Sequence, residues 1–283
     1  MDATRIAAGL ALSALTCFTN VLAQDEPNGF RLRQHQVSTQ NSSDEDVRAE
    51  IEFGQIIAAR VLGRIALQHN NDWTTYVNLI GRTLTLHANR PELDFHFAVL
   101  DADFINAYSA PGGYVFITRG AIAAMQDESE LAAVLAHEIA HITEKHIVKE
   151  HNIRARDTSA LSTVSSIVGG AQDSARLAVM QAVDKAVDML LTTGPKHEDE
   201  LAADETALLL LANTGYDPFA LQRLLSRVSE MDAEAQTGGK VTHPPTRERI
   251  DRLAKLAQDN RMEHMRNYQG KERFQTHAQA LPN

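Results

Sequence analysis

The chain has 283 residues, which is enough for one large domain or two small ones. Hydrophobic residues make up 43% of it and charged residues 23%, a composition that excludes an intrinsically disordered protein. The formal net charge of -10 argues against a general nucleic-acid binder.

Residues 1–23 have the features of a secretory signal peptide. Arg5 supplies a weak positive start, residues 6–18 form a short apolar run, and Ala23 follows with a small side chain at the cleavage position. We expect cleavage before Gln24 and no membrane span after the signal is removed. The alternative is an uncleaved N-terminal anchor.

The only cysteine, Cys17, lies inside this apolar run. The mature chain would therefore have neither a disulfide nor a thiolate metal ligand. Any zinc site in it must use histidine and carboxylate side chains.

Residues 24–43 are polar and without periodicity, and we expect a flexible lead segment. From Asp44 to Ile65 the apolar residues recur at helical spacing, and residues 73–84 repeat that pattern after a break. Two helices are therefore predicted before Pro91.

Residues 94–100 and 114–118 are predicted to be strands, joined by the turn-rich segment 106–113. They suggest a small antiparallel sheet in a mainly helical α+β fold. The edge strand of such a sheet offers a place where an extended peptide adds as another strand. An ordinary hairpin is the alternative.

Residues 131–141, LAAVLAHEIAH, contain the strongest chemical signal of the sequence. His137 and His141 are four residues apart and share one helical face, so both rings can reach one metal ion. Glu138 is placed to contact a metal-bound water as general base. The alternative, a buried helix with two satisfied histidines, does not explain a glutamate among alanines and leucines.

The helix that carries this motif is expected to run from Glu128 to about Lys149. His146 is one residue off the spacing of a third ligand in the longer HExxHxxGxxH pattern. His146 and His151 are therefore predicted to lie on the exposed face of the helix.

Residues 155–194 begin with a segment rich in serine, alanine and glycine, in which Gly169 and Gly170 suggest a hinge. Residues 177–191 then show the amphipathic spacing of a helix that packs on the core. Charged residues in this region oppose a membrane span.

Glu200 and Asp204 are four residues apart at the start of another predicted helix. The spacing suits a carboxylate metal ligand followed by a carboxylate that holds a ligand histidine. The alternative is a solvated acidic helix start, which the helix dipole also favours.

The remaining chain is predicted to form a helix over 219–230, a mobile loop over 234–240 and a helix that ends near 258. His243 follows the loop and precedes two prolines that start the last helix. The tail, 259–283, is polar and uninformative.

Four separated motifs occur in one order: N106-A-Y-S-A-P-G-G113, the HExxH motif at 137–141, E200-L-A-A-D204, and His243 with Arg249. Over residues 44–258 this resembles the zinc metallopeptidase family M48, the group of HtpX-like, BepA-like and CAAX-prenyl-endopeptidase-like enzymes. The resemblance implies a gluzincin-type zinc peptidase domain over 44–258.

By this resemblance one Zn²⁺ is held by His137, His141 and Glu200, and Glu138 is the catalytic base. Asp204 and Arg249 support the ligands, and His243 acts at the metal, either as a transition-state contact or as a reversible plug. Asn106, Gly112 and Gly113 match the substrate-side strand and its turn.

The sequence departs from some members of the family. It shows neither the membrane helices of HtpX-like proteins nor the helical repeat domain of BepA-like ones, and Lys196-His197 replaces the usual Ser-Arg before the glutamate ligand. The resemblance implies the periplasm, misfolded or envelope proteins as polypeptide substrates, a role in protein quality control, and the outer-membrane assembly machinery as a candidate partner. A chaperone or binding protein with a closed zinc site is the alternative.

Overall fold

The computed structural model describes residues 44–154, 173–234, 242–265 and 268–278. Several predicted features lie outside these residues: the signal peptide, the lead segment, the Gly169-Gly170 hinge and most of the loop at 234–240. Within the described residues, no helix combines the length and the apolar character needed to cross a membrane.

Two helices open the described chain close to the positions that the apolar periodicity predicts. The first, α2 (Asp44–Leu62), carries three acidic residues in its first turn, where the helix dipole favours them. The second, α3 (Asn71–Thr85), is capped by Asn70, whose side chain accepts hydrogen bonds from two backbone amides of the first turn.

A three-stranded sheet follows, formed by β1 (His96–Leu100), β2 (Ala107–Ala110) and β3 (Tyr114–Thr118). The predicted mainly helical α+β class is confirmed, but the sheet is mixed. Its order is β1-β3-β2, with β3 parallel to β1 and antiparallel to β2. The prediction assigned the residues of β2 to a turn between two antiparallel strands. In the structure they form a strand that pairs antiparallel with β3, while β1 and β3 are parallel.

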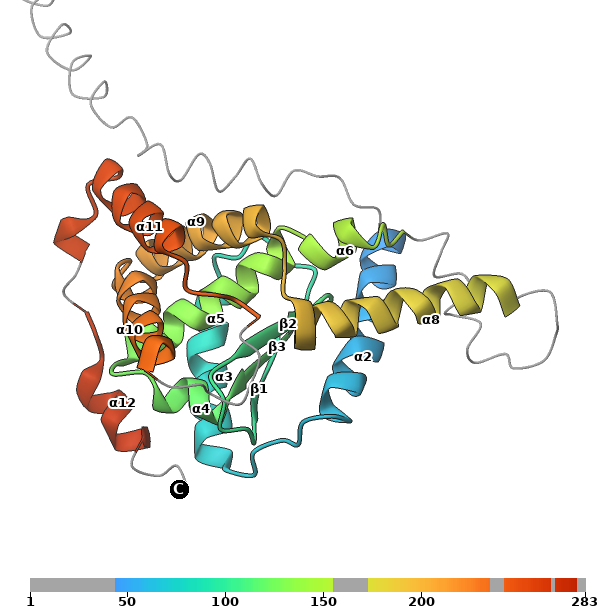
Figure 1. Ribbon diagram of the computed structural model, residues 1–283, viewed down its shortest axis with the longest axis horizontal. Helices are drawn as coiled ribbons and strands as arrows, with labels where there is room; N and C mark the ends of the chain where they lie inside the picture. The colour runs from blue at the N-terminus through green and yellow to red at the C-terminus, as the bar shows by residue number, and fades with distance from the viewer. Residues whose placement is uncertain (1–43, 155–172, 235–241, 266–267, 279–283) are drawn as a thin grey trace, which may run out of the picture. The chain divides into compact units, whose positions relative to one another are not determined.

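The central helix is α5 (Glu128–Thr143), preceded by the short α4 (Arg119–Ala123) and followed by α6 (His146–Glu150). Figure 1 shows α5 crossing the middle of the described fold between α9 (His197–Thr214) and the strands. Leu131, Leu135 and Ile139 are fully buried. The apolar side chains of α5 thus belong to the hydrophobic core, and the side chains of its HExxH motif are buried as well.

The predicted amphipathic helix is α8 (Asp173–Asp188), which continues into a π-helical turn, η2 (Met189–Thr193). Val183, Val187 and Leu190 lie in one buried cluster with Phe53 and Ile57 of α2. This helix therefore packs on the core, as its spacing predicts.

The C-terminal part contains α10 (Ala220–Glu234), α11 (Arg247–Asp259), a short 3₁₀ turn η3 (Glu263–Met265) and α12 (Lys271–Ala278). The helix α12 lies in the tail 259–283, for which no structure was predicted. Phe274 of α12 is buried and packs edge-on against Trp73 of α3. Arg273 also forms an ion pair with the buried Glu128 at the start of α5.

Candidate active site

The helix α5 presents His137 and His141 on one face, as their spacing requires. Asp127 caps the helix start by accepting a hydrogen bond from the Glu130 amide at 2.9 Å. The Nε2 atoms of His137 and His141 lie 3.1 Å apart, and both side chains are buried. Two nitrogens bound at 2.0–2.1 Å to one tetrahedral zinc would be separated by about 3.3 Å.

The helix α9 packs against α5 (Figure 1). Glu200, in the first turn of α9, lies beside the two histidines. Its Oε1 lies 3.2 Å from Nε2 of His141, and its Oε2 lies 3.5 Å from Nε2 of His137. Only 2% of the Glu200 side chain is exposed. A carboxylate in so little water must be compensated by cations or hydrogen bonds.

Asp204 and Arg249 supply part of that compensation. Asp204 Oδ1 lies 3.0 Å from Nδ1 of His137, and Arg249 donates to both Asp204 oxygens at 2.7 and 2.8 Å. A further Arg249 nitrogen lies 2.6 Å from Oε2 of Glu200. The four side chains form a buried network that fixes the outer nitrogen of His137.

The surrounding charges keep both carboxylates ionised. Burial alone would raise the pKa of Asp204, but Arg249 and His137 outweigh it and lower that pKa. Burial likewise opposes ionisation of Glu200, yet the neighbouring His243 and His137 hold its pKa well below the usual range. Glu200 is therefore available as an anionic ligand.

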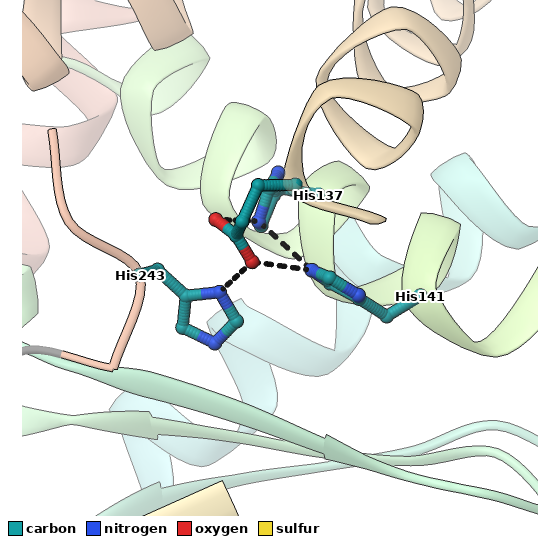
Figure 2. A group of neighbouring side chains, drawn as sticks. His137, His141 and His243 are labelled. Carbon is teal, nitrogen blue, oxygen red and sulfur yellow. Dashed lines mark hydrogen bonds and ion pairs between the residues drawn. The ribbon is translucent and has the colours of Figure 1, made fainter. Parts of the chain in front are cut away.

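His243 completes the cluster from the segment before α11. Its Nδ1 lies 2.7 Å from Oε1 of Glu200, and its Nε2 lies 3.7 Å from Oε1 of Glu138. Figure 2 shows its ring converging with those of His137 and His141. Arg249 donates to the Pro244 carbonyl at 3.1 Å and so ties this segment to the network.

The donors present fit a divalent metal. His137, His141, Glu200 and His243 each offer one ligand atom, and these atoms all lie within 4.8 Å of one another. Two imidazoles with a carboxylate are a zinc ligand set. Burial works against a charge on His137, but Glu200 and Asp204 overcome it and raise its pKa to about 9. The site therefore attracts a cation.

Glu138 lies beside these candidate ligands with its side chain 2% exposed. Its Oε2 is buried and has no hydrogen-bond partner among the described residues. This carboxylate oxygen of Glu138, which has no partner in the described part of the chain and lies next to the candidate metal ligands, is placed to bind a water molecule. The geometry is compatible with the role of base that the motif predicts.

Asn106, which directly precedes β2, is buried and hydrogen-bonded through both its amide oxygen and its amide nitrogen. Its Oδ1 accepts from the hydroxyl of Thr242 at 3.0 Å and from the Ala107 amide at 3.0 Å, and its Nδ2 lies 3.2 Å from the Tyr108 hydroxyl. Asn106 thus connects the edge strand to the residue that precedes His243.

Gly112 and Gly113 lie in the turn at the other end of β2, with φ values of 76° and 101°. A Cβ atom on Gly112 would meet the Cα of Ile51 at 2.8 Å, and one on Gly113 would meet the Asp94 carbonyl oxygen at 2.4 Å. Close backbone packing against neighbouring segments therefore explains both glycines.

The prediction that His146 and His151 are exposed is wrong. His146 is only 6% exposed, and its Nδ1 lies 2.8 Å from Nδ1 of His141. His151 is half-buried against Phe53. The helix α5 was predicted to run to Lys149 but ends at Thr143. The chain then changes direction before α6. Helical spacing alone could not reveal that turn.

An apolar pocket of about 80 Å³ adjoins the site on the side of His137 and Glu138. Its apolar lining comes from α4, α5, α10, the start of β2 and the loop segments beside β2, α4 and α11. The lining includes Ile105, Ala121, Val134, Leu221, Leu224 and Val228. The spacing of apolar residues in the sequence gave no signal for this pocket, because its walls come from several segments far apart in the chain.

Comparison with known proteins places these residues in a family. The model of Peptidase family M48 matches residues 72–257. The chain is 26% identical over 219 residues to the beta-barrel assembly-enhancing protease of Escherichia coli, covering 76% of this chain and 45% of that protein. It is 29% identical over 185 residues to the mitochondrial metalloendopeptidase OMA1 of Schizosaccharomyces pombe, covering 64% of this chain and 52% of that protein.

The same comparison finds the beta-barrel assembly-enhancing protease of Yersinia pestis, 26% identical over 214 residues, with 74% of this chain and 44% of that protein covered. The chain thus spans about half the length of these curated relatives. The matched region contains the whole His137, His141, Glu200 and His243 cluster. The chain belongs to Peptidase family M48.

Proposed function

We propose that the protein is a zinc-dependent endopeptidase. The observation that carries this proposal is the convergence of His137, His141 and Glu200 within ligand distance of one point, with Glu138 beside them. The family match supports the reaction class. When bound there, zinc supplies Lewis-acid activation of a water molecule and of the scissile carbonyl.

Glu138 is the general base in this proposal. Its unpaired Oε2 accepts a proton from the attacking water and later donates it to the leaving amine. Asp204 holds the ring of His137 through Nδ1, so that Nε2 keeps its lone pair for the metal. Arg249 balances the charge of both buried carboxylates.

His243 controls access in the proposed mechanism. Its ring makes the cluster a set of four protein donors, and four protein ligands are typical of a closed zinc site. We favour a reversible plug, in which His243 leaves the cluster when substrate enters. The alternative role, a donor to the oxyanion, has the opposite effect on activity when the ring is removed.

The proposed substrate is an extended polypeptide. β2 is an edge strand of the sheet and packs beside α5, so a peptide added along it passes the cluster. Asn106 and the Gly112-Gly113 turn fix the two ends of that strand. The apolar pocket next to Glu138 is placed to accept an apolar side chain of the substrate.

The cellular setting is also a proposal. Removal of residues 1–23 would give a periplasmic protein that starts at Gln24, with misfolded or envelope proteins as substrates and the outer-membrane assembly machinery as partner. The name of the bacterial relatives, beta-barrel assembly-enhancing protease, supports the proposed link to an assembly machinery. Intact-mass measurement of periplasmic protein tests it, and a mass that retains Met1 contradicts cleavage.

A second candidate function is a chaperone or binding protein with a permanently closed zinc site. The 2.7 Å approach of His243 to Glu200 favours it, because this ring adds a fourth protein donor to the cluster. The retained Glu138 favours the enzyme, since a structural metal site needs no base.

The two functions are separated by metal analysis and proteolysis of the same samples. We expect about one zinc per chain, digestion of unfolded casein, loss of digestion with a chelator, and recovery when zinc is restored. Glu198→Gln, an exposed carboxylate on α9, serves as control. Full zinc occupancy in both the wild type and His243→Ala without any digestion would favour the binding protein.

A further inference from the structure

We propose that His146 is a positioning residue of the metal site. Its ring accepts a hydrogen bond from Nδ1 of His141 and is itself oriented by Asp199. The inference rests on the proposed metal site, because it concerns how one ligand is held. No motif marks His146, and helical spacing placed it on the solvent side.

The ring nitrogens of His141 define the direction of this hydrogen bond. Nε2 of His141 faces the other ligand groups, 3.2 Å from Glu200 and 3.1 Å from His137. A metal bound at Nε2 requires the lone pair there, so the proton of the neutral ring must sit on Nδ1. That nitrogen lies 2.8 Å from Nδ1 of His146.

Two ring nitrogens at this distance cannot both carry a proton. Nδ1 of His146 is therefore the acceptor, and the proton of a neutral His146 lies on Nε2. That Nε2 is 3.6 Å from Oδ1 of Asp199, at the distance of an electrostatic contact. The side chains of His146 and Asp199 are 5% and 23% exposed, so the pair is partly shielded from water.

Each of the two ligand histidines has a polar side chain next to its outer ring nitrogen, Nδ1. Nδ1 of His137 lies 3.0 Å from Oδ1 of Asp204 as an ion-pair contact outside hydrogen-bond geometry, and Nδ1 of His141 is hydrogen-bonded to His146 at 2.8 Å. Metal-binding histidines generally donate their second N–H to such a partner, which fixes the tautomer and the ring plane. Asp199 directly precedes Glu200, so the contact also joins the start of α9 to α6.

The backbone between the two helices is built for this contact. Five residues in an uninterrupted α-helix would place His146 about 140° around the axis from His141, too far for the rings to meet. Instead α5 ends at Thr143, and Lys145 adopts a left-handed conformation with φ of 58°. A non-glycine residue in that region is strained, and here the strained residue directly precedes His146.

Nitrogen NMR of the zinc-loaded wild-type protein tests the proposal without any substitution. We expect His141 to be coordinated through Nε2 with its proton on Nδ1, and His146 to carry its proton on Nε2. A His146 ring protonated on Nδ1 would overturn the proposal. Absence of zinc from the wild-type protein would instead refute the proposed metal site itself.

Two substitutions test the energetic consequence. His146→Phe keeps a ring but removes the acceptor, and His146→Asn places an amide oxygen near the position of Nδ1. We expect the zinc Kd of the phenylalanine variant to rise by about 10- to 100-fold, the range typical of lost ligand-supporting contacts, and the asparagine variant to recover most of the affinity. The exposed His197, replaced by Asn, is the control.

The absorption of the cobalt-substituted proteins gives a second readout that a merely structural role would not change. The ligand-field bands should shift in His146→Phe and stay near the wild-type positions in His146→Asn. Wild-type affinity and an unchanged spectrum in a folded His146→Phe protein would reject the positioning role. If that variant does not fold, the tautomer measurement on the wild-type protein decides the question.

Discussion

His243 Nδ1 lies 2.7 Å from Glu200 Oε1, so the residue before the Pro244-Pro245 pair is in contact with a proposed metal ligand that lies 43 positions earlier. The contact depends on a short segment held at both sides. The Thr242 hydroxyl donates a hydrogen bond to Asn106, the residue before the edge strand β2, and the Pro244 carbonyl accepts one from Arg249. The ring is therefore positioned by the segment and not by a helix.

We predict that His243→Ala raises the initial rate of proteolysis, because the variant leaves three protein ligands and an open position. Rates should be measured on an unfolded substrate at equal zinc occupancy, with the exposed His197→Ala as control. A fall in the rate that corresponds to a barrier higher by about 2.7–4 kcal/mol, the cost of losing an oxyanion donor, would show that His243 is a donor and not a plug. Equal rates would remove His243 from the site.

We predict that Glu200→Ala loses most of its zinc, because the substitution removes the carboxylate from the four-donor cluster. Asp204→Asn should weaken zinc binding by about 10- to 100-fold, since it weakens the contacts of Asp204 with His137 and Arg249 but removes no ligand. Metal content after dialysis and Kd from chelator competition measure both effects. Glu198→Gln on the same helix is the control. Full occupancy in dialysed Glu200→Ala would refute its role as a ligand.

We predict that Val134→Phe changes which peptide bonds are cut. Val134 lines the apolar pocket one turn before Glu138. The phenylalanine ring of the variant would occupy much of the pocket, whose volume is about 80 Å³. Peptides with a large apolar residue beside the cleaved bond should lose at least about tenfold in kcat/KM, in line with pocket discrimination of one or a few methylenes.

Peptides with alanine at that position should be nearly unaffected by Val134→Phe. Leu79→Phe, on the exposed side of α3, controls for the added ring. An equal loss on both kinds of peptide would mean that the pocket does not select the substrate.

We predict an acid-sensitive contribution to stability from Glu128. Burial opposes its ionisation, but Arg273 and the Tyr76 hydroxyl outweigh burial and lower its pKa. A carboxyl group with a lowered pKa in the folded state stabilises the fold above its unfolded pKa of about 4.3, and this contribution disappears as the pH falls through the folded value.

Urea unfolding of the wild type between pH 7 and pH 2 should therefore show a steeper loss of stability in acid than unfolding of Glu128→Gln. Glu272→Gln, an exposed carboxyl group on the same α12 as Arg273, is the control. Parallel pH profiles for the wild type and Glu128→Gln would contradict the predicted contribution.

The parts of the site that lie on regular helices could be predicted from sequence. His137, Glu138 and His141 follow from helical spacing alone, and Glu200 from its place in a second polar helix start. The structure brings His137, His141 and Glu200 into one cluster with His243, and Glu138 lies beside that cluster. Their roles as ligands and base remain predictions.

The features that sequence reasoning missed depend on breaks in regular structure. β2 has only four residues and lies in a segment rich in turn formers, so its pairing with β3 left no periodic signal. His146 meets His141 only because Lys145 takes a left-handed conformation. The helix α12 is polar apart from Phe274, whose burial depends on Trp73, about 200 positions earlier.

The central claim, that Glu138 acts on a metal held by His137, His141 and Glu200, is tested most directly by Glu138→Gln. The substitution keeps size and shape but removes the base, so zinc content and thermal stability should match the wild type while casein digestion falls to nearly nothing. Zinc content and initial rate should be measured on the same preparation. A Glu138→Gln protein that holds zinc and digests casein at the wild-type rate would contradict the account.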